Sequence, residues 1–309
     1  MCSRVARSKS MDGTRTRTES SLSRDAHLEA RVVRHGVMTL ALVLAVAPMA
    51  PAQSRAPRAS KTVAPARPSA PPSTDSLDVI SRRGKVLAER DSIAWLGADA
   101  MTSLSLPEDH VRRLIVRRAV QGWEVATGQL AEDGREYLIE QLATPGIQAS
   151  RWASTLFDPP RPDTEYFASA ARAIETALIM FRPVAPRPYI ATAVPAEDGP
   201  SWWVYLYPAP ARAGVWPRGG DMRFRVSADG RVMTESRRLH EAITEYSVRT
   251  ARSASAPGAY RQPAVSGDAP EDTDVFHVLQ RRPALPELMT AGRFRYRIDV
   301  DGSIRRLAN

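Results

Sequence analysis

The sequence of 309 residues predicts an α+β protein, in which an N-terminal helical layer packs on a C-terminal antiparallel sheet with two Asp-Gly hairpins. Three observations predict this class. Between residues 74 and 182, apolar residues recur at spacings of three and four, which is typical of amphipathic helices. From residue 188 to residue 309, several stretches alternate apolar and polar residues, which is typical of strands. The pattern Arg–aromatic–Arg–aliphatic–x–x–Asp–Gly also occurs twice, at residues 223–230 and 295–302.

Residues 1–52 have the pattern of a leader with a signal peptide. Arg31 and Arg34 precede a short apolar run at residues 37–47, and Ala50-Pro51-Ala52 supplies a small-residue cleavage site. The apolar run is shorter than the about 20 residues that a membrane span needs. We therefore expect an exported protein, periplasmic or secreted, with no membrane span after processing.

Residues 53–73 are rich in Pro and Ala and have almost no large apolar side chains. Such a composition cannot bury enough surface to offset chain entropy, so this segment is predicted to be a disordered tether. The helical part, residues 74–182, and the β part, residues 188–309, are expected to form one composite domain.

The clearest helical patterns lie at residues 105–122 and 163–181. Ser105 and Glu108 have the S-x-x-E spacing of a capping box, and an apolar stripe follows them. Asp163 or Thr164 is expected to cap the second helix. Weaker helical patterns occur at residues 75–97 and 131–143.

In the β part, residues 202–207 are apolar or aromatic at every position, which predicts a central strand covered on both faces. The strands that begin at residues 222 and 293 alternate aromatic or aliphatic residues with arginines, so we expect Arg223 and Arg225 to face water. Asp-Gly is a strong signal for a tight hairpin turn. Nucleic-acid platforms expose aromatic and basic residues on the same face, and this alternation separates them.

Charge and cysteine content argue against a nucleic-acid-binding protein and against a fold held by disulfides or thiolate metal sites. Of 43 basic and 34 acidic residues, residues 1–52 hold 8 and 4, so the remainder carries 35 − 30 = +5 without a clustered basic stripe. We therefore expect no nucleic-acid partner. The sole cysteine, Cys2, precedes the predicted cleavage site, so the processed chain has no disulfide and no thiolate metal site.

No common catalytic or phosphate-binding motif occurs, and we expect no cofactor and no metal. Three histidines follow the leader. His110 is interpreted as a surface or cap residue, His240 as part of a solvated turn in which Arg237 pairs with Glu241, and His277 as a buried, hydrogen-bonded residue on a strand. The alternative is a hydrolase site of His240, His277 and Asp274, since imidazole and carboxylate also suit zinc.

The segment at residues 208–221 follows the central strand and is interpreted as a loop that presents Trp216 and Arg218, with Asp221 at its end as the third candidate ligand-binding residue. A loop held by rigid strands is a common binding arrangement. In the competing interpretation, Trp216 packs into the core, because large aromatic side chains dominate core burial.

Residues 201–279 contain W-V-Y-L-x-P, G-G-D-x-R-F, D-G and L-H in succession. This pattern resembles that of exported bacterial proteins of unknown function. The resemblance implies the compartment and architecture described above, and it points to Asp221, His240 and Asp274 as recurring polar positions. We therefore expect an exported cell-envelope protein that binds a small ligand or a partner protein without catalysis, with the hydrolase as the alternative.

Overall fold

The computed structural model describes residues 72–102, 112–146, 151–247 and 267–308. The predicted leader, all but the last two residues of the predicted tether, the capping box at Ser105 and Glu108, and His110 lie outside these ranges. Among the described residues, no helix is both long and apolar enough to span a membrane.

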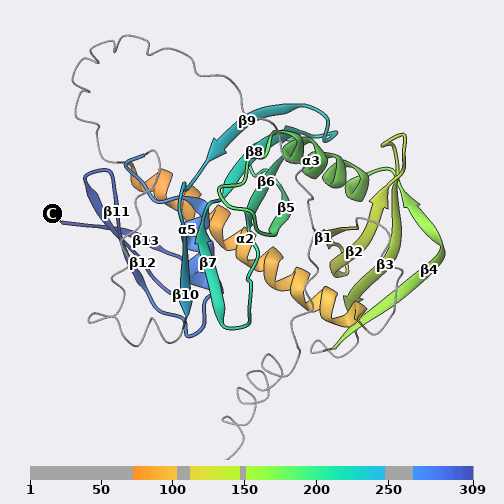
Figure 1. Cartoon of the computed structure of the whole chain (residues 1–309), viewed down its shortest axis with the longest axis horizontal. Coiled ribbons are helices and arrows are strands. Elements are labelled where there is room, and N and C mark those ends of the chain that lie inside the picture. Colours follow the sequence, from red (N-terminus) through yellow and green to blue (C-terminus); the bar gives the residue numbers. More distant parts are fainter. Residues whose placement is uncertain (1–71, 103–111, 147–150, 248–266, 309) are drawn as a thin grey trace, which may run out of the picture. The chain divides into compact units, whose positions relative to one another are not determined.

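The prediction of a mixed α+β fold is confirmed (Figure 1). The described residues form three helices, which are α2 (Thr74–Met101), α3 (Tyr166–Met180) and α5 (Asp272–Gln280). Thirteen strands accompany them, and every strand pair is antiparallel.

The strands form four sheets. The first has the order β1-β2-β3-β4, with β1 (Arg113–Ala119), β2 (Gly122–Leu130), β3 (Tyr137–Pro145) and β4 (Trp152–Asp163). The second has the order β5-β6-β8-β9, with β5 (Tyr189–Pro195), β6 (Ser201–Pro208), β8 (Met222–Ser227) and β9 (Met233–Arg238). The third pairs β7 (Val215–Gly219) with β10 (Ile243–Ser247). The fourth has the order β11-β12-β13, with β11 (Glu287–Ala291), β12 (Phe294–Ile298) and β13 (Ile304–Leu307).

The first sheet corrects the prediction that residues 74–182 are helical. Strand β1 lies within the segment predicted as a helix at residues 105–122, and β3 overlaps the one predicted at residues 131–143. The neighbours Ile115 and Val116 are both buried, but they belong to different core clusters. Because successive side chains of a strand point to opposite faces, a strand buried on both faces has no alternation. Its apolar residues can then match a helical spacing by chance.

The prediction of a helix at residues 75–97 is confirmed by α2, which is capped by the Ser73 side chain. At 28 residues, α2 contributes to three core clusters in turn, through Leu77, then Leu87, then Met101. It passes so close to α5 that a Cβ atom on Gly84 would lie 2.5 Å from the carbonyl oxygen of Asp272. Glycine permits this close approach of two helices.

The predicted helix at residues 163–181 is confirmed by α3, and the Asp163 side chain accepts hydrogen bonds from the backbone N–H groups of Phe167 and Ala168. The buried face of α3 shares one core cluster with residues of the first and second sheets. This helix therefore joins those two sheets.

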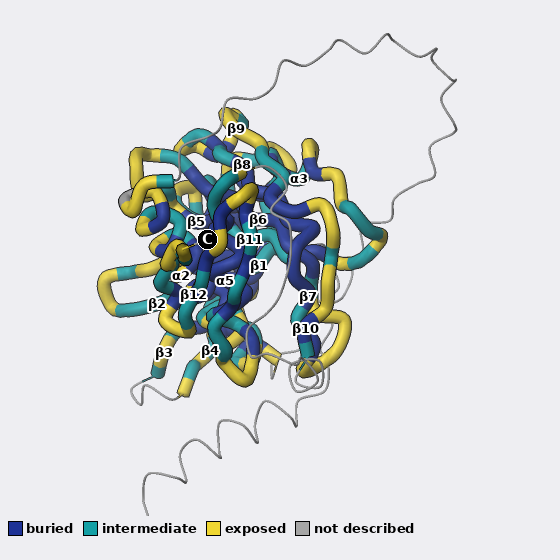
Figure 2. Tube along the Cα trace, turned by 90° about the vertical axis from the view of Figure 1, so that its left-hand side faces the viewer, coloured by how far each residue is buried: buried dark blue, intermediate teal, exposed yellow. Residues whose placement is uncertain are grey.

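Strand β6 is buried along nearly its whole length, as predicted for residues 202–207 (Figure 2). Trp202, Val204 and Leu206 pack in the cluster around α3. Trp203, Tyr205 and Tyr207 pack on the opposite face with residues of α2 and α5. That second face is therefore covered by two helices.

The expectation that Arg223 faces water is wrong. Arg223 is 6% exposed, and its Nη1 atom donates to Asp272 Oδ2 of α5 at 2.5 Å. Arg225, two residues further along β8, is half-buried and forms two bonds with the exposed side chain of Asp198. The alternation of β8 has the expected period, but α5 covers the face that was assigned to solvent.

Both Asp-Gly dipeptides lie between paired strands. Gly230 has φ +79° in the connection between β8 and β9, and Gly302 has φ +78° between β12 and β13. Phe294, Tyr296 and Ile298 of β12 are buried. Exposed Arg295 occupies the other face of that strand.

Residues 272–280 form helix α5, so the assignment of His277 to a strand is wrong. A capping box of Glu271 and Asp274 starts the helix, and Asp272 and Asp274 in its first turn are favourable beside the N-terminal dipole. Residues 272–278 are all buried. A helix buried on all sides lacks the one-sided stripe that identifies helices in a sequence.

Candidate functional site

A buried histidine between two carboxylates forms the centre of a charged cluster. His240 Nδ1 lies 2.7 Å from Asp221 Oδ1, and His240 Nε2 lies 3.3 Å from Asp274 Oδ1. Asp221 directly precedes β8 and His240 follows β9 by two residues, and the backbone N–H of Leu239 donates to the carbonyl of Asp221 at 3.0 Å. The pairing of β8 with β9 therefore brings Asp221 and His240 to the same end of the sheet, where α5 adds Asp274.

The interpretation of His240 as part of a solvated turn is therefore wrong, since His240 is 1% exposed. Arg237 pairs with Glu271, whereas Glu241 is exposed. Because β9 ends at Arg238, residues 237 and 241 do not share a helical face.

Two arginines extend the cluster. Arg218 Nη2 lies 2.7 Å from Asp274 Oδ1, and Arg218 Nη1 donates to Glu287 Oε1. Arg281 Nη1 donates to Glu287 Oε2 at 2.8 Å. The segment predicted as a loop contains strand β7, which carries Arg218 into the interior, so Arg218 is unavailable as a surface ligand group. We call the six residues Arg218, Asp221, His240, Asp274, Arg281 and Glu287 the buried charge network.

The charges of this network balance. Burial would lower the pKa of His240, but Asp221 and Asp274 outweigh it and raise that pKa well above its ordinary value. Burial would also raise the pKa of Asp274, but His240 and Arg218 hold it well below its ordinary value. The pKa of Asp221 is likewise lowered by His240 against the effect of burial. Three cations therefore face three carboxylates.

This arrangement does not favour His240 as a general base or as a zinc ligand. A histidine that acts as a general base must be unprotonated, and His240 is held as an imidazolium by two carboxylates. Zinc also requires neutral imidazole. Within the described ranges, no group of three or more His, Asp, Glu or Cys side chains is arranged to hold a metal ion.

His277 is buried, as predicted, but the expected hydrogen bond is missing at one ring atom. In the part of the chain that the structure describes, His277 Nε2 has no hydrogen-bond partner. Burial lowers the pKa of His277 to about 3, so its ring is neutral at neutral pH. His240 and Asp274 lie together, whereas no hydrogen bond among the described residues joins His277 to either of them.

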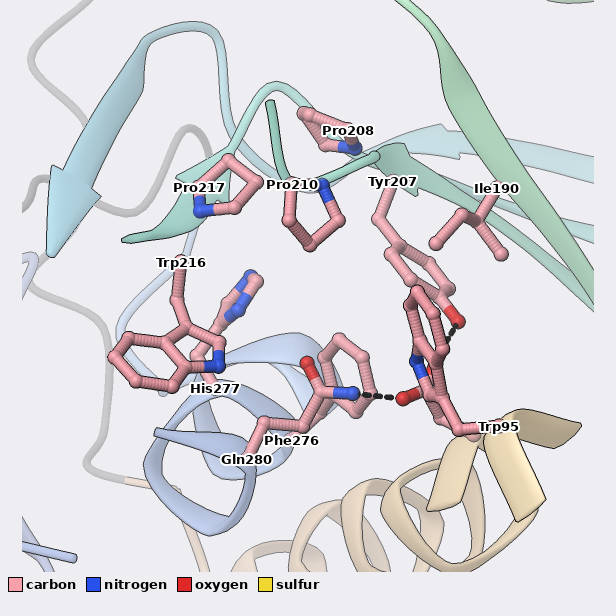
Figure 3. A pocket seen from close by; sticks show the side chains of 11 residues that line it. Trp95, Ile190, Tyr207, Pro208, Pro210, Trp216, Pro217, Phe276, His277 and Gln280 are labelled. Atoms are coloured by element: carbon pink, nitrogen blue, oxygen red, sulfur yellow. Dashed lines mark hydrogen bonds between the residues drawn. The ribbon is translucent and has the colours of Figure 1, made fainter. Parts of the chain in front are cut away.

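A small pocket lies beside the buried charge network, and His277 forms part of its wall (Figure 3). Figure 3 shows Trp216 and His277 on one side of the pocket and Tyr207, Ile190 and Trp95 on the other. The lining is completed by Asp91, Pro208, Pro210, Pro217, Phe276 and Gln280. The pocket volume is about 20 Å³, which is room for one or two groups of the size of water.

Two tryptophans lie in the wall of this pocket. Trp95 of α2 is 54% exposed, and Trp216 of β7 is half-buried, with its ring centroid 6.1 Å from that of Tyr246. Trp216 is therefore neither a fully buried core residue nor the tip of a loop. Of the predicted ligand-binding residues, only Trp216 lines the pocket, since Arg218 and Asp221 belong to the buried charge network.

Asp91 of α2 is the acidic residue of the pocket, and the sequence analysis missed it. It is 4% exposed, Tyr207 Oη donates to its Oδ1 at 2.7 Å, and the Gln280 amide donates to its Oδ2. Burial raises the pKa of Asp91 to about 6, although hydrogen bonds from Tyr207, Trp95 and Gln280 oppose the shift. An aspartate within a helical pattern gives no signal of such a role, because its partners come from β6 and α5.

Comparisons with family models, with curated proteins and with solved structures found no match to this chain. The resemblance of residues 201–279 to exported bacterial proteins therefore stays a prediction.

Proposed function

We propose that this protein is an exported, non-catalytic binding protein of the cell envelope, which holds a group of a small ligand or partner protein in the pocket between α2, β7 and α5. Export, to the periplasm or beyond the cell, is proposed from the charged flank, apolar run and small-residue site within residues 31–52. Binding is proposed from the pocket itself.

One observation carries the proposal. The pocket contains the buried Asp91 carboxylate, which has no basic partner among the described residues, and the buried His277 Nε2, which has no hydrogen-bond partner there, beside the exposed ring of Trp95. Buried polar groups without full partners are costly, and such groups commonly have a functional reason. A few polar atoms within an apolar lining are also typical of ligand sites.

The hydrolase alternative has less support. Its candidate residues His240 and Asp274 bind each other and further charged residues within the buried charge network. His277 is neutral and could act as a base only with a nucleophile or water beside it.

The two Asp-Gly turns are proposed to be architectural, since Gly230 fits against α3 and Gly302 against Lys85 of α2.

The proposal is tested with the exported chain in thermal melts against a panel of small amines, alcohols, carboxylates and sugars. A ligand that binds only the folded state raises the melting temperature, and the rise grows with the logarithm of the ligand concentration once that concentration exceeds Kd. We expect at least one class to stabilise the wild type and to lose this effect in Trp95→Ala, which removes an exposed side chain. Hydrolysis of an ester, amide or phosphoester substrate that His277→Ala abolishes would instead establish the hydrolase.

A further inference from the structure

Among the residues that the structure describes, Asp91 is the buried carboxylate that lacks a cationic partner. The buried acidic residues of the described chain are Asp91, Glu140, Asp221, Glu271, Asp272, Asp274 and Glu287. Each of the other six forms an ion pair with an arginine or with His240. Among the described residues no basic side chain pairs with Asp91, whose donors are the neutral groups of Tyr207, Gln280 and Trp95.

A buried carboxylate without a counter-ion is unfavourable, because burial removes the hydration that stabilises its charge. This carboxylate also lies in the wall of the pocket, where His277 Nε2 is a buried atom without a hydrogen-bond partner among the described residues. We propose that the pocket binds a primary ammonium group, with the Asp91 carboxylate as its counter-ion and the rings of Trp95 and Trp216 beside it. This inference rests on the proposed function and names its ligand class.

The size of the pocket selects the kind of cation. A volume of about 20 Å³ admits an ammonium head and the carbon next to it, whereas a guanidinium or a quaternary ammonium group is larger. A divalent metal ion would need about six oxygen ligands, and Asp91 is the sole carboxylate in the described lining.

The remaining lining suits an organic ammonium group. Aromatic rings attract cations through their faces, and tryptophan does so most strongly. A carboxylate has about four acceptor sites, so Asp91 can accept from an ammonium group while it keeps its bonds to Tyr207 and Gln280. The neutral ring of His277 offers one further acceptor, provided that Nε2 is the unprotonated nitrogen.

The ammonium group could belong to a free small amine or to a lysine side chain of a partner protein. Calorimetric titration of the exported chain distinguishes these sources with two probes. One is n-butylamine, with n-butanol as its neutral counterpart. The other is a five-residue capped peptide with a central lysine, with its acetyl-lysine form as the counterpart. All titrations use the same ionic strength.

We expect n-butylamine to bind and n-butanol not to bind. Asp91→Asn should weaken amine binding at least tenfold, as expected when one partner of a buried ion pair is neutralised. Trp95→Ala should weaken it by about two- to thirtyfold. The matched control is Asp78→Asn, which neutralises an exposed aspartate on the same helix and should leave the affinity unchanged. A lysine peptide that binds at least tenfold more tightly than n-butylamine would identify a protein lysine as the source.

Equal affinities for n-butanol and n-butylamine, or measurable and equal affinities for the lysine and acetyl-lysine peptides, would overturn the inference. The same holds if Asp91→Asn folds and keeps wild-type affinity. The peptide comparison uses the wild-type chain alone, so it decides the question even if Asp91→Asn fails to fold. If an alcohol, sugar or carboxylate binds and Trp95→Ala abolishes that binding, the proposed function stands while the ammonium inference fails. If no class of ligand binds, both fail.

Discussion

Substitution of Arg218 by methionine should strongly destabilise the fold. Arg218 is 4% exposed and contacts Asp274 and Glu287, both of which are fully buried. Methionine has a similar length without the charge. The buried charge network, which has three cations and three carboxylates, would then have two cations and three carboxylates. Loss of one partner from a buried ion pair costs about 3–5 kcal/mol. In a domain of this size, that loss lowers the melting temperature by about 6–20 °C.

The control is Arg225→Met on the neighbouring strand β8. Arg225 forms two bonds with Asp198, but the Asp198 side chain is 45% exposed, so the loss should be at most about 1 kcal/mol. Urea unfolding followed by circular dichroism measures both variants. The deficit of Arg218→Met should shrink as the pH falls toward 4, because the uncompensated carboxylate can then take a proton. Equal losses in the two variants, or a deficit that does not change with pH, would refute the assignment of a buried, charge-balanced network.

Because the pKa of His240 is raised in the folded state, its contribution to the free energy of unfolding is complete below pH 6.5 and is lost as the pH rises through the folded-state pKa. The free energy of unfolding, measured from pH 6 to 10, should therefore decline in the wild type, and His240→Leu should lack this decline. The pKa of Asp91 is raised from 3.8 to about 6, which corresponds to a change of at most about 3 kcal/mol in the free energy of unfolding. This free energy should therefore fall as the pH rises from 4 to 6, and Asp91→Asn should flatten the fall. Gly230→Ala should lower the free energy of unfolding in urea by about 1–3 kcal/mol more than Gly134→Ala does. Both glycines have positive φ, so the backbone strain is shared, but only a Cβ at residue 230 would meet backbone, 2.3 Å from the Ser169 carbonyl oxygen.

The parts of the fold that could be predicted are those with a local signal. Residues 202–207 are apolar at every position, and β6 is covered on both faces. The helix α3 has a one-sided stripe and an N-terminal Asp163 that accepts two backbone bonds. In both cases the order of apolar and polar residues along the segment predicts which faces of the element are buried.

The errors arise where burial on several sides removes the local pattern. In β1 the adjacent residues Ile115 and Val116 enter different core clusters, so no alternation remains. In α5 every residue from 272 to 278 is buried. Both segments were assigned to the wrong kind of element, because periodicity separates helices from strands only when one face meets water.

The candidate site depends on distant partners, which explains why its residues were misjudged. His240 binds Asp221, which lies 19 residues away, and Asp274, which lies further along the chain. Arg223 was assigned to water because nothing in β8 indicates that Asp272 of α5 lies above it. The alternation within β8 was predicted correctly. The sequence of β8 does not show which helix covers the strand, because that depends on the whole fold.

Helix α5 connects the buried charge network to the pocket. In its first turn, Asp274 is held by Arg218 and His240. Later in the helix, His277 and Gln280 line the pocket, and the Gln280 amide donates to Asp91. A helix of nine residues is short, so its position depends on tertiary contacts more than on helix propensity. The network therefore acts as a support that fixes one wall of the pocket. It follows that Arg218→Met should weaken the proposed ligand binding although Arg218 does not line the pocket, whereas Arg225→Met should leave that binding unchanged. If Arg218→Met folds and binds as the wild type does, the two sites are independent.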